Sequence, residues 1–172
     1  MISINAGHGF NSTGCYGNGL HEEKYVRDIL KRVKKILTNN DIDFKDSTID
    51  YATSLKTLEY QCLITNINKC NLAISIHVNC ATNTSANGIE CHVYGKNSTK
   101  AINFSNKLLA KNDIFKNRGV KYSPSLYFLK HTNCNAVIIE LGFASNKNDV
   151  AILNNNKQKI SEMIAQTIIE QK

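Results

Sequence analysis

Short apolar runs alternate with longer amphipathic segments along this chain, and this alternation restricts its possible folds more than any other feature. Residues 2–5, 72–76 and 136–139 are apolar runs of the length expected for buried strands. Apolar residues recur at helical spacing in residues 22–37 and 157–170. Strands that alternate with helices are typical of a mostly parallel sheet covered on both faces.

Weaker forms of the same two patterns predict four more elements: strands at residues 42–44 and 88–94, and helices at residues 55–67 and 98–111. Three segments show neither pattern and are predicted as loops or irregular structure: residues 6–20, 115–130 and 141–156. We therefore predict an α/β fold, with a single domain over residues 1–172 and a mostly parallel twisted sheet flanked by helices on both faces.

Polar side chains lie at the ends of the three apolar runs. His8 follows the first run, His77 directly follows the second, and Glu140 directly follows the third. In open α/β sheets, ligands bind in the crevice outside the carboxyl ends of the parallel strands. We therefore expect these three side chains to converge, as the ligands of a metal site do.

Glu22 is the predicted partner of the two histidines. The apolar stripe of helix 22–37 passes through Val26, Ile29 and Val33 and continues onto Glu22, whereas Glu23 lies toward its edge. A carboxylate on an apolar face needs a cation or hydrogen bonds to compensate it. Two histidines and one carboxylate leave a zinc ion an open fourth position, which is typical of catalytic sites. The alternative is that Glu22 and Glu23 only favour the positive end of the helix dipole.

Glu140 is not needed as a ligand and is predicted to act as an acid and base, taking a proton from a metal-activated water and returning it to a leaving nitrogen. The structural alternative is an ion pair with Arg118 or with a lysine. A histidine at the rim of a sheet can also be an ordinary polar residue. We expect this for three of them: His21, His92 and His131.

The formal net charge of +7 indicates an anionic partner, which could be nucleic acid, a membrane surface or a cell-wall polymer. The six cysteines show no CxxC spacing, and we expect reduced structural thiols made in a reducing compartment. No apolar stretch has transmembrane length and the first residues do not read as a signal peptide, so synthesis in the cytoplasm without membrane insertion is expected.

Six short segments carry a resemblance to a known family: residues 5–9, Glu22, and residues 75–79, 117–120, 125–129 and 139–143. In their order and residue types they resemble the zinc-dependent N-acetylmuramoyl-L-alanine amidases of the third amidase type, which occur in phage endolysins and bacterial autolysins. The chain departs from the family where Asn5-Ala6 replaces the frequent Asp-Pro before the first Gly-His, so the turn there is expected to differ locally.

The resemblance implies zinc held by His8, Glu22 and His77, with Glu140 as the catalytic acid and base. It implies a sheet of about six strands, and it places Asn79 and Arg118 near the substrate groove. The implied reaction is hydrolysis of the amide bond between the lactyl group of N-acetylmuramic acid and the L-alanine of the stem peptide.

The expected protein is therefore a peptidoglycan hydrolase, in the first instance a phage endolysin that acts on the wall after release. Its expected partners are peptidoglycan and anionic wall polymers, without nucleic acid, and it is expected to be a monomer. Three alternatives remain open: a zinc peptidase that cuts within the stem peptide, a basic nucleic-acid-binding protein favoured only by charge, and a wall-binding module without activity. Many relatives also carry a separate wall-binding module, so we expect either a catalytic domain cut from a longer protein or a basic surface that alone supplies wall affinity.

Overall fold

The three apolar runs form the centre of a six-stranded sheet in the computed structural model, which describes residues 1–9, 13–50 and 53–171. The strand order is β4 (Phe44–Asp46), β1 (Ile2–Ala6), β5 (Leu72–Asn79), β8 (Asn135–Phe143), β6 (Ile89–Val93) and β7 (Asn117–Tyr122). All neighbours pair in parallel except β6 and β8, which are antiparallel. The predicted α/β fold with a mostly parallel sheet is confirmed.

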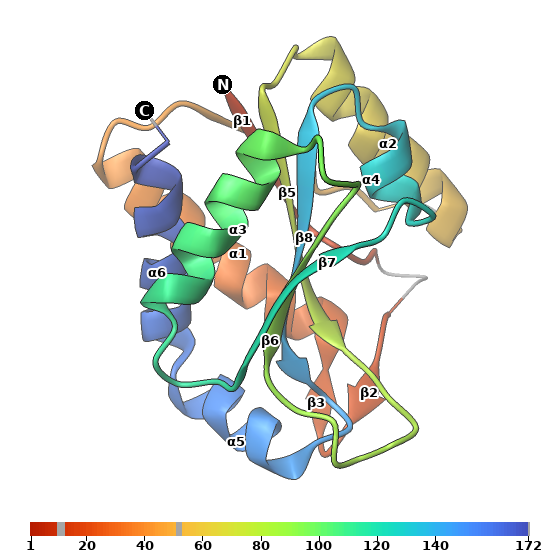
Figure 1. Cartoon of the computed structure of the whole chain (residues 1–172), viewed down its shortest axis with the longest axis vertical. Helices are drawn as coiled ribbons and strands as arrows, with labels where there is room; N and C mark the ends of the chain where they lie inside the picture. The colour runs from red at the N-terminus through yellow and green to blue at the C-terminus, as the bar shows by residue number, and fades with distance from the viewer. Residues whose placement is uncertain (10–12, 51–52, 172) are drawn as a thin grey trace.

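Helices cover both faces of this sheet (Figure 1). One face carries α1 (Glu22–Asn39), α3 (Thr99–Lys111) and α6 (Lys157–Ile169). The other face carries α2 (Ser54–Ile67) and the short α4 (Tyr127–His131). Helix α5 (Lys147–Asn155) follows β8, and a small hairpin of β2 (Tyr16–Gly17) and β3 (Leu20–His21) precedes α1. None of the helices in the described ranges combines the length and apolar character needed to cross a bilayer.

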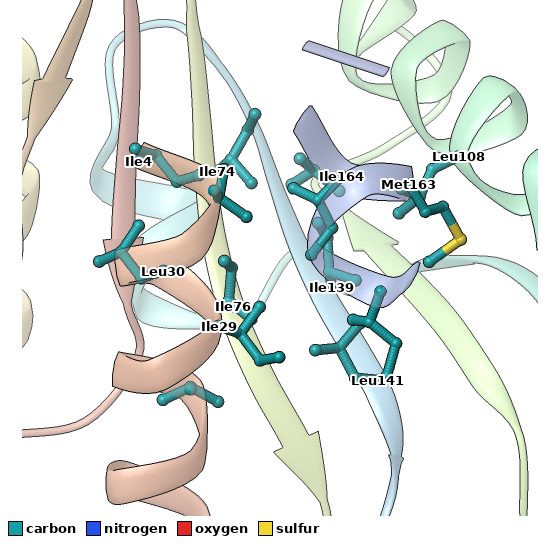
Figure 2. Packing of buried hydrophobic residues seen from close by; sticks show 14 of the residues in the cluster. Ile4, Ile29, Leu30, Ile74, Ile76, Leu108, Ile139, Leu141, Met163 and Ile164 are labelled. Atoms are coloured by element: carbon teal, nitrogen blue, oxygen red, sulfur yellow. The ribbon is translucent and has the colours of Figure 1, made fainter. Parts of the chain in front are cut away.

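The main core lies between the sheet and the α1–α3–α6 layer, and Figure 2 shows part of it. Strand residues meet helix residues there: Ile4, Ile74, Ile76, Ile139 and Leu141 from the strands, and Ile29, Leu30, Leu108, Met163 and Ile164 from the helices. Burying each such side chain stabilises the fold by about 1.5–3 kcal/mol. The continuous apolar character of β1, β5 and β8 follows from their central place in the sheet, where both faces are covered.

The opposite face divides into an apolar half and a polar half. Near the start of β5 and β8, Ala73, Ala136 and Ile138 pack in a second cluster with residues of α2 and α4. Alternate strand residues share a face, so the same face continues along these strands as His77 and Glu140. The helices of this face therefore complete a core over one end of the strands, and polar groups occupy the other end.

Two predicted irregular segments contain regular structure. Residues 115–130 include β7 and α4, and residues 141–156 include α5, so those two predictions were wrong. Strand β7 lies at the edge of the sheet and is largely exposed, and therefore lacks an apolar run. Helix α5 begins at a polar cap, where the Asn146 side chain accepts hydrogen bonds from two backbone amides. The predicted loop 6–20 contains the β2–β3 hairpin except for its last residue, His21, and its residues 10–12 lie outside the described part of the chain.

Candidate metal centre

His8, Glu22 and His77 come together at the carboxyl ends of β1 and β5, where α1 begins. Their potential ligand atoms all lie within 4.8 Å of one another. Glu22 Oε1 is 3.1 Å from His8 Nε2 and 3.1 Å from His77 Nδ1. Two imidazole nitrogens and one carboxylate oxygen form a donor set that suits a divalent metal ion such as zinc and leaves a coordination position open.

Glu22 is only 3% exposed, and hydrogen bonds hold both of its oxygens. Oε1 accepts from the backbone amide of Val78 at 3.0 Å, and Oε2 accepts from that of Cys15 at 2.7 Å. Burial raises the pKa of Glu22, but the hydrogen bonds and charges of His77 and His8 outweigh it and lower the pKa far below its usual range. Glu22 is therefore ionised, as a metal ligand must be. Glu23 instead forms an ion pair with Arg27 on the same helix.

The ring of His77 is oriented by a second hydrogen bond. Its Nε2 lies 3.1 Å from Ser75 Oγ, and that hydroxyl donates to Asn5 Oδ1 at 2.7 Å. Because the serine proton is used toward Asn5, the serine oxygen accepts from His77 Nε2–H. Nδ1 is then the ring nitrogen that faces the ligand cluster, 3.1 Å from Glu22 Oε1, and the one that could bind a metal ion. Ligating histidines commonly have such an outer hydrogen bond on their other ring nitrogen.

Two glycines leave room for the ligand side chains. A Cβ atom added to Gly7 would collide with the imidazole of His77. One added to Gly14 would collide with the carboxylate of Glu22, and Gly14 also has a φ of +69°, which other residues rarely adopt. The backbone before and after His8 therefore approaches the other two ligands so closely that no side chain fits there.

Glu140 lies beside this cluster. In the parallel β5–β8 ladder its Cα is opposite that of His77, so the two side chains share one face of the sheet. Its Oε2 atom is buried and has no hydrogen-bond partner within the described residues. Burial raises the pKa of Glu140 well above its usual range, and the nearby charges of Glu22 and Glu90 raise it further. Arg118 forms its ion pair with Glu90, so the alternative ion pair between Glu140 and Arg118 is not formed.

Asn79 and Arg118 both donate hydrogen bonds to Glu90, a residue that the sequence did not indicate as part of the site. Asn79 Nδ2 donates to Glu90 Oε1 at 3.0 Å, and Arg118 Nε donates to Glu90 Oε2 at 2.8 Å. Glu90 lies on β6, directly opposite Glu140 in the antiparallel ladder. The sequence predicted a strand that includes Glu90. It did not predict that Glu90 lies beside Glu140, because this depends on the pairing of β6 with β8, for which the sequence offers no direct signal.

The other histidines lie outside the ligand cluster. His92 Nδ1 is 2.8 Å from Ser123 Oγ, and its Nε2 is 3.4 Å from Glu90 Oε1. His21 lies against the ring of Tyr16, and His131 stacks on another tyrosine one helical turn away.

Cys15 and Cys80 form a disulfide at the edge of the cluster, with their Cα atoms 5.9 Å apart. The expectation of six reduced thiols was therefore wrong for these two cysteines, and the other four are free. The bridge joins the loop before α1 to the residue after β5, which are 65 residues apart. Sequence spacing could not predict it, because it depends on the convergence of these two segments in the fold.

An open depression of about 470 Å³ collects these groups at the surface. It is lined by the three candidate ligands, the disulfide, two further polar side chains and two other residues: His8, Glu22, His77, Cys15, Cys80, Asn79, Glu140, Gly14 and Val78. Two imidazoles and a carboxylate that could hold a metal ion, beside a buried carboxyl group that could transfer a proton, form an arrangement suited to hydrolysis.

Comparison with known proteins places this chain in a family. The family described as N-acetylmuramoyl-L-alanine amidase matches residues 2–170. The endolysin of Bacillus phage SPP1 is 28% identical over 165 residues, covering 89% of this chain and 58% of the endolysin. The N-acetylmuramoyl-L-alanine amidase LytC of Bacillus subtilis is 30% identical over 162 residues, covering 88% of this chain and 31% of LytC. The chain thus spans less than two thirds of the length of either relative.

The solved catalytic domain of CwlV, an N-acetylmuramoyl-L-alanine amidase from Bacillus (Paenibacillus) polymyxa var. colistinus, shares the fold with a TM-score of 0.86. The likeness covers 99% of this chain and 96% of that domain, at 24% identity.

Proposed function

The chain belongs to the N-acetylmuramoyl-L-alanine amidase family, and from this membership we propose that residues 1–172 act as one catalytic domain that cleaves peptidoglycan. The family and enzyme class predicted from the sequence are confirmed. The proposed reaction is hydrolysis of the amide bond between the lactyl group of N-acetylmuramic acid and the L-alanine of the stem peptide. The observation that carries it is the convergence of His8, Glu22 and His77 beside the buried carboxyl group of Glu140.

His8, Glu22 and His77 are the proposed zinc ligands. Their donor atoms, the ionised state of Glu22 and the hydrogen bond that orients His77 all support this assignment. Zinc bound there would lower the pKa of a water molecule from ~16 to about 7 and would polarise the scissile carbonyl group.

Glu140 is the proposed acid and base. A group in this role must gain and lose a proton during turnover, and burial together with the charges of Glu22 and Glu90 raises the pKa of Glu140 above its ordinary value. Its Oε2 has no competing hydrogen bond within the described residues, so it can accept the proton of the attacking water. The same oxygen then returns the proton to the nitrogen of L-alanine, which leaves as a free amine. Asn79 and Arg118 are proposed to bind the substrate beside it.

The test is a comparison of Glu140→Gln with a matched change on the far side of the fold, Glu170→Gln, whose side chain pairs with Lys111. Both variants are expected to bind one zinc per chain by elemental analysis. E140Q should release almost no amine from purified walls, and E170Q should match the wild type. Removal of zinc by a chelator should stop the wild type, and added zinc should restore it. Full activity of E140Q would contradict the role of Glu140.

Mass spectrometry of the released fragments separates the proposed bond from other bonds in peptidoglycan. The proposed cleavage liberates intact stem peptides with a free amine on L-alanine. A peptidase would release shorter peptides, and a wall-binding module would release nothing. Either result with the zinc-loaded wild type would refute the amidase proposal.

We further propose that the enzyme acts as a phage endolysin on the wall, a role supported by its similarity to the phage endolysin. Expression inside a Gram-positive host should leave cells intact until a separately induced pore-forming protein opens the membrane. Lysis without the pore would contradict this role.

We also propose that anionic wall polymers attract the protein to the wall, which its net charge of +7 supports. Binding to walls stripped of these polymers should therefore be weaker.

A further inference from the structure

Glu90 lies in the polar half of the sheet but takes no part in the proposed metal site or in proton transfer. It is 5% exposed and shares a sheet face with Glu140, so a charge at this position needs compensation. Both oxygens have partners, since Oε1 accepts from Asn79 and Oε2 accepts from Arg118. Glu90 thus links the two residues proposed to bind substrate.

The contacts of Arg118 fix the plane and direction of its guanidinium group. Nε donates to Glu90, Nη1 donates to the carbonyl oxygen of Asn87 at 3.4 Å, and the central carbon lies 4.9 Å from the centre of the Phe143 ring. A guanidinium group has five N–H donors, and these hydrogen bonds use two of them. The side chain is 30% exposed, so it is not closed off from the solvent.

Hydrogen bonds also hold both ends of the Asn79 side-chain amide. Its Oδ1 accepts from the backbone amide of Cys80 at 2.7 Å, and its Nδ2 donates to Glu90. These two bonds determine which end of the amide faces Glu90. Because Asn79 also lines the depression at the metal centre, Glu90 connects that depression to Arg118.

We propose that Glu90 is a positioning residue that holds Arg118 so that its free donors bind a carboxylate group of the stem peptide. The planar donor fork of arginine matches a carboxylate in two parallel hydrogen bonds, and Glu90 occupies only one edge of that fork. The inference rests on the proposed amidase function, because the residue after L-alanine is a γ-linked D-glutamate whose α-carboxylate is either free or amidated. The free carboxylate is the proposed ligand.

The experiment compares two soluble substrates with the zinc-loaded protein: N-acetylmuramoyl-L-alanyl-γ-D-glutamyl-L-lysine and the same compound with the D-glutamate α-carboxylate converted to a carboxamide. For the wild type, kcat/KM should favour the carboxylate about tenfold, mainly through KM. Arg118→Gln should reduce this ratio to about one, since it loses the charged fork. Arg118→Lys should keep only part of it, because a lysine supplies a charge without the fork.

The Glu90 variants test positioning. Glu90→Gln removes the charge that fixes Arg118 while keeping the size of the side chain, so the substrate ratio should fall although Arg118 is intact. A purely structural role would lower the melting temperature and leave the ratio unchanged, which would overturn the positioning role. Glu170→Gln is the matched control and should keep the wild-type ratio. Binding of the carboxylate peptide to Glu140→Gln protein, with and without Glu90→Gln, provides a second measurement that needs no turnover.

The outcomes distinguish the two proposals. If the wild type cleaves both substrates with equal kcat/KM, the carboxylate site is wrong and the amidase function stands. If it cleaves neither substrate and releases nothing from walls, the amidase function itself fails, and this inference fails with it. A third substrate with an amidated lysine carboxyl group should be cleaved like the first. A loss of rate there would overturn the assignment to the D-glutamate carboxylate in favour of the peptide terminus.

Discussion

Removal of the Cys15–Cys80 disulfide should cost the protein a large part of its stability. The bridge closes a loop with a sequence separation of 65 residues. On the chain-entropy account, a cross-link of this span restricts the unfolded chain by about 14–15 cal/mol/K, or about 4 kcal/mol at 25 °C. For a chain of 172 residues this corresponds to a fall of about 10 °C in the melting temperature.

The same change should weaken the metal centre, because each half of the bridge adjoins a group at the site. The amide of Cys15 donates to Glu22, and the amide of Cys80 donates to the Asn79 side chain. Without the bridge, the loop that carries Cys15 is tied to β5 only through weaker contacts, so the position of Glu22 relative to His77 becomes less fixed. Zinc should therefore bind more weakly to the variant.

The assay is thermal unfolding followed by circular dichroism, with zinc-free and zinc-loaded protein, for the wild type and Cys15→Ser/Cys80→Ser. A thiol reductant should lower the melting temperature of the wild type to that of the double variant and leave the double variant unchanged. Cys134→Ser, which alters a free and partly exposed cysteine, is the control and should respond to the reductant as the wild type does. Identical melting curves for oxidised and reduced wild type would refute the reasoning.

Three further predictions concern single side chains. Ser75→Ala removes the acceptor that orients His77, and equilibrium dialysis should show zinc affinity reduced by about 10–100-fold with little change in fold; an unchanged affinity would refute the orienting role. Asp149→Ala leaves two buried backbone amides without their acceptor and should lower the free energy of unfolding by about 2–4 kcal/mol, whereas Asp149→Asn keeps an acceptor and should cost less; equal denaturant midpoints for the two variants would contradict this. Burial raises the pKa of Asp46, but hydrogen bonds, chiefly from Lys34, outweigh it and lower the pKa. The resulting stability is present above the unfolded-state pKa of about 4 and is lost as the pH falls through the lower folded-state value. In urea titrations, the free energy of unfolding should therefore fall less between pH 7 and pH 3 for Asp46→Asn than for the wild type. An equal fall in both proteins would argue against the ion pair of Asp46 with Lys34.

The central strands could be predicted from the sequence because burial on both faces makes their apolar runs continuous. Strand β7 could not, since an edge strand needs few apolar residues and its pairing with β6 is a non-local contact. Helix α5 was also missed, because it is short and its start depends on the Asn146 cap and on Asp149, which binds backbone amides outside its own helix.

The sequence could predict those residues of the candidate site that lie at the ends of predicted strands or on the apolar stripe of a predicted helix. The rule that parallel strands present their carboxyl ends at one edge indicated His8, His77 and Glu140, and the apolar stripe of α1 indicated Glu22. The partnership of Glu90 with Arg118 requires the order of β8, β6 and β7 in the sheet, and the disulfide requires the fold of the loop before α1. Neither is determined by local sequence.

Three carboxyl groups lie at or beside the candidate site, Glu90 and Glu140 on the polar half of the sheet face and Glu22 at the start of α1, and each is compensated in a different way. The charge of Glu22 is stabilised by His8 and His77, as a site for a metal ion requires. Burial and the neighbouring charges raise the pKa of Glu140 and so favour its neutral form, and the charge of Glu90 is paired with Arg118. Three like charges at such short range could not otherwise be buried together. The compensation therefore separates their proposed roles: Glu22 binds the metal, Glu140 transfers the proton and Glu90 positions the substrate-binding arginine.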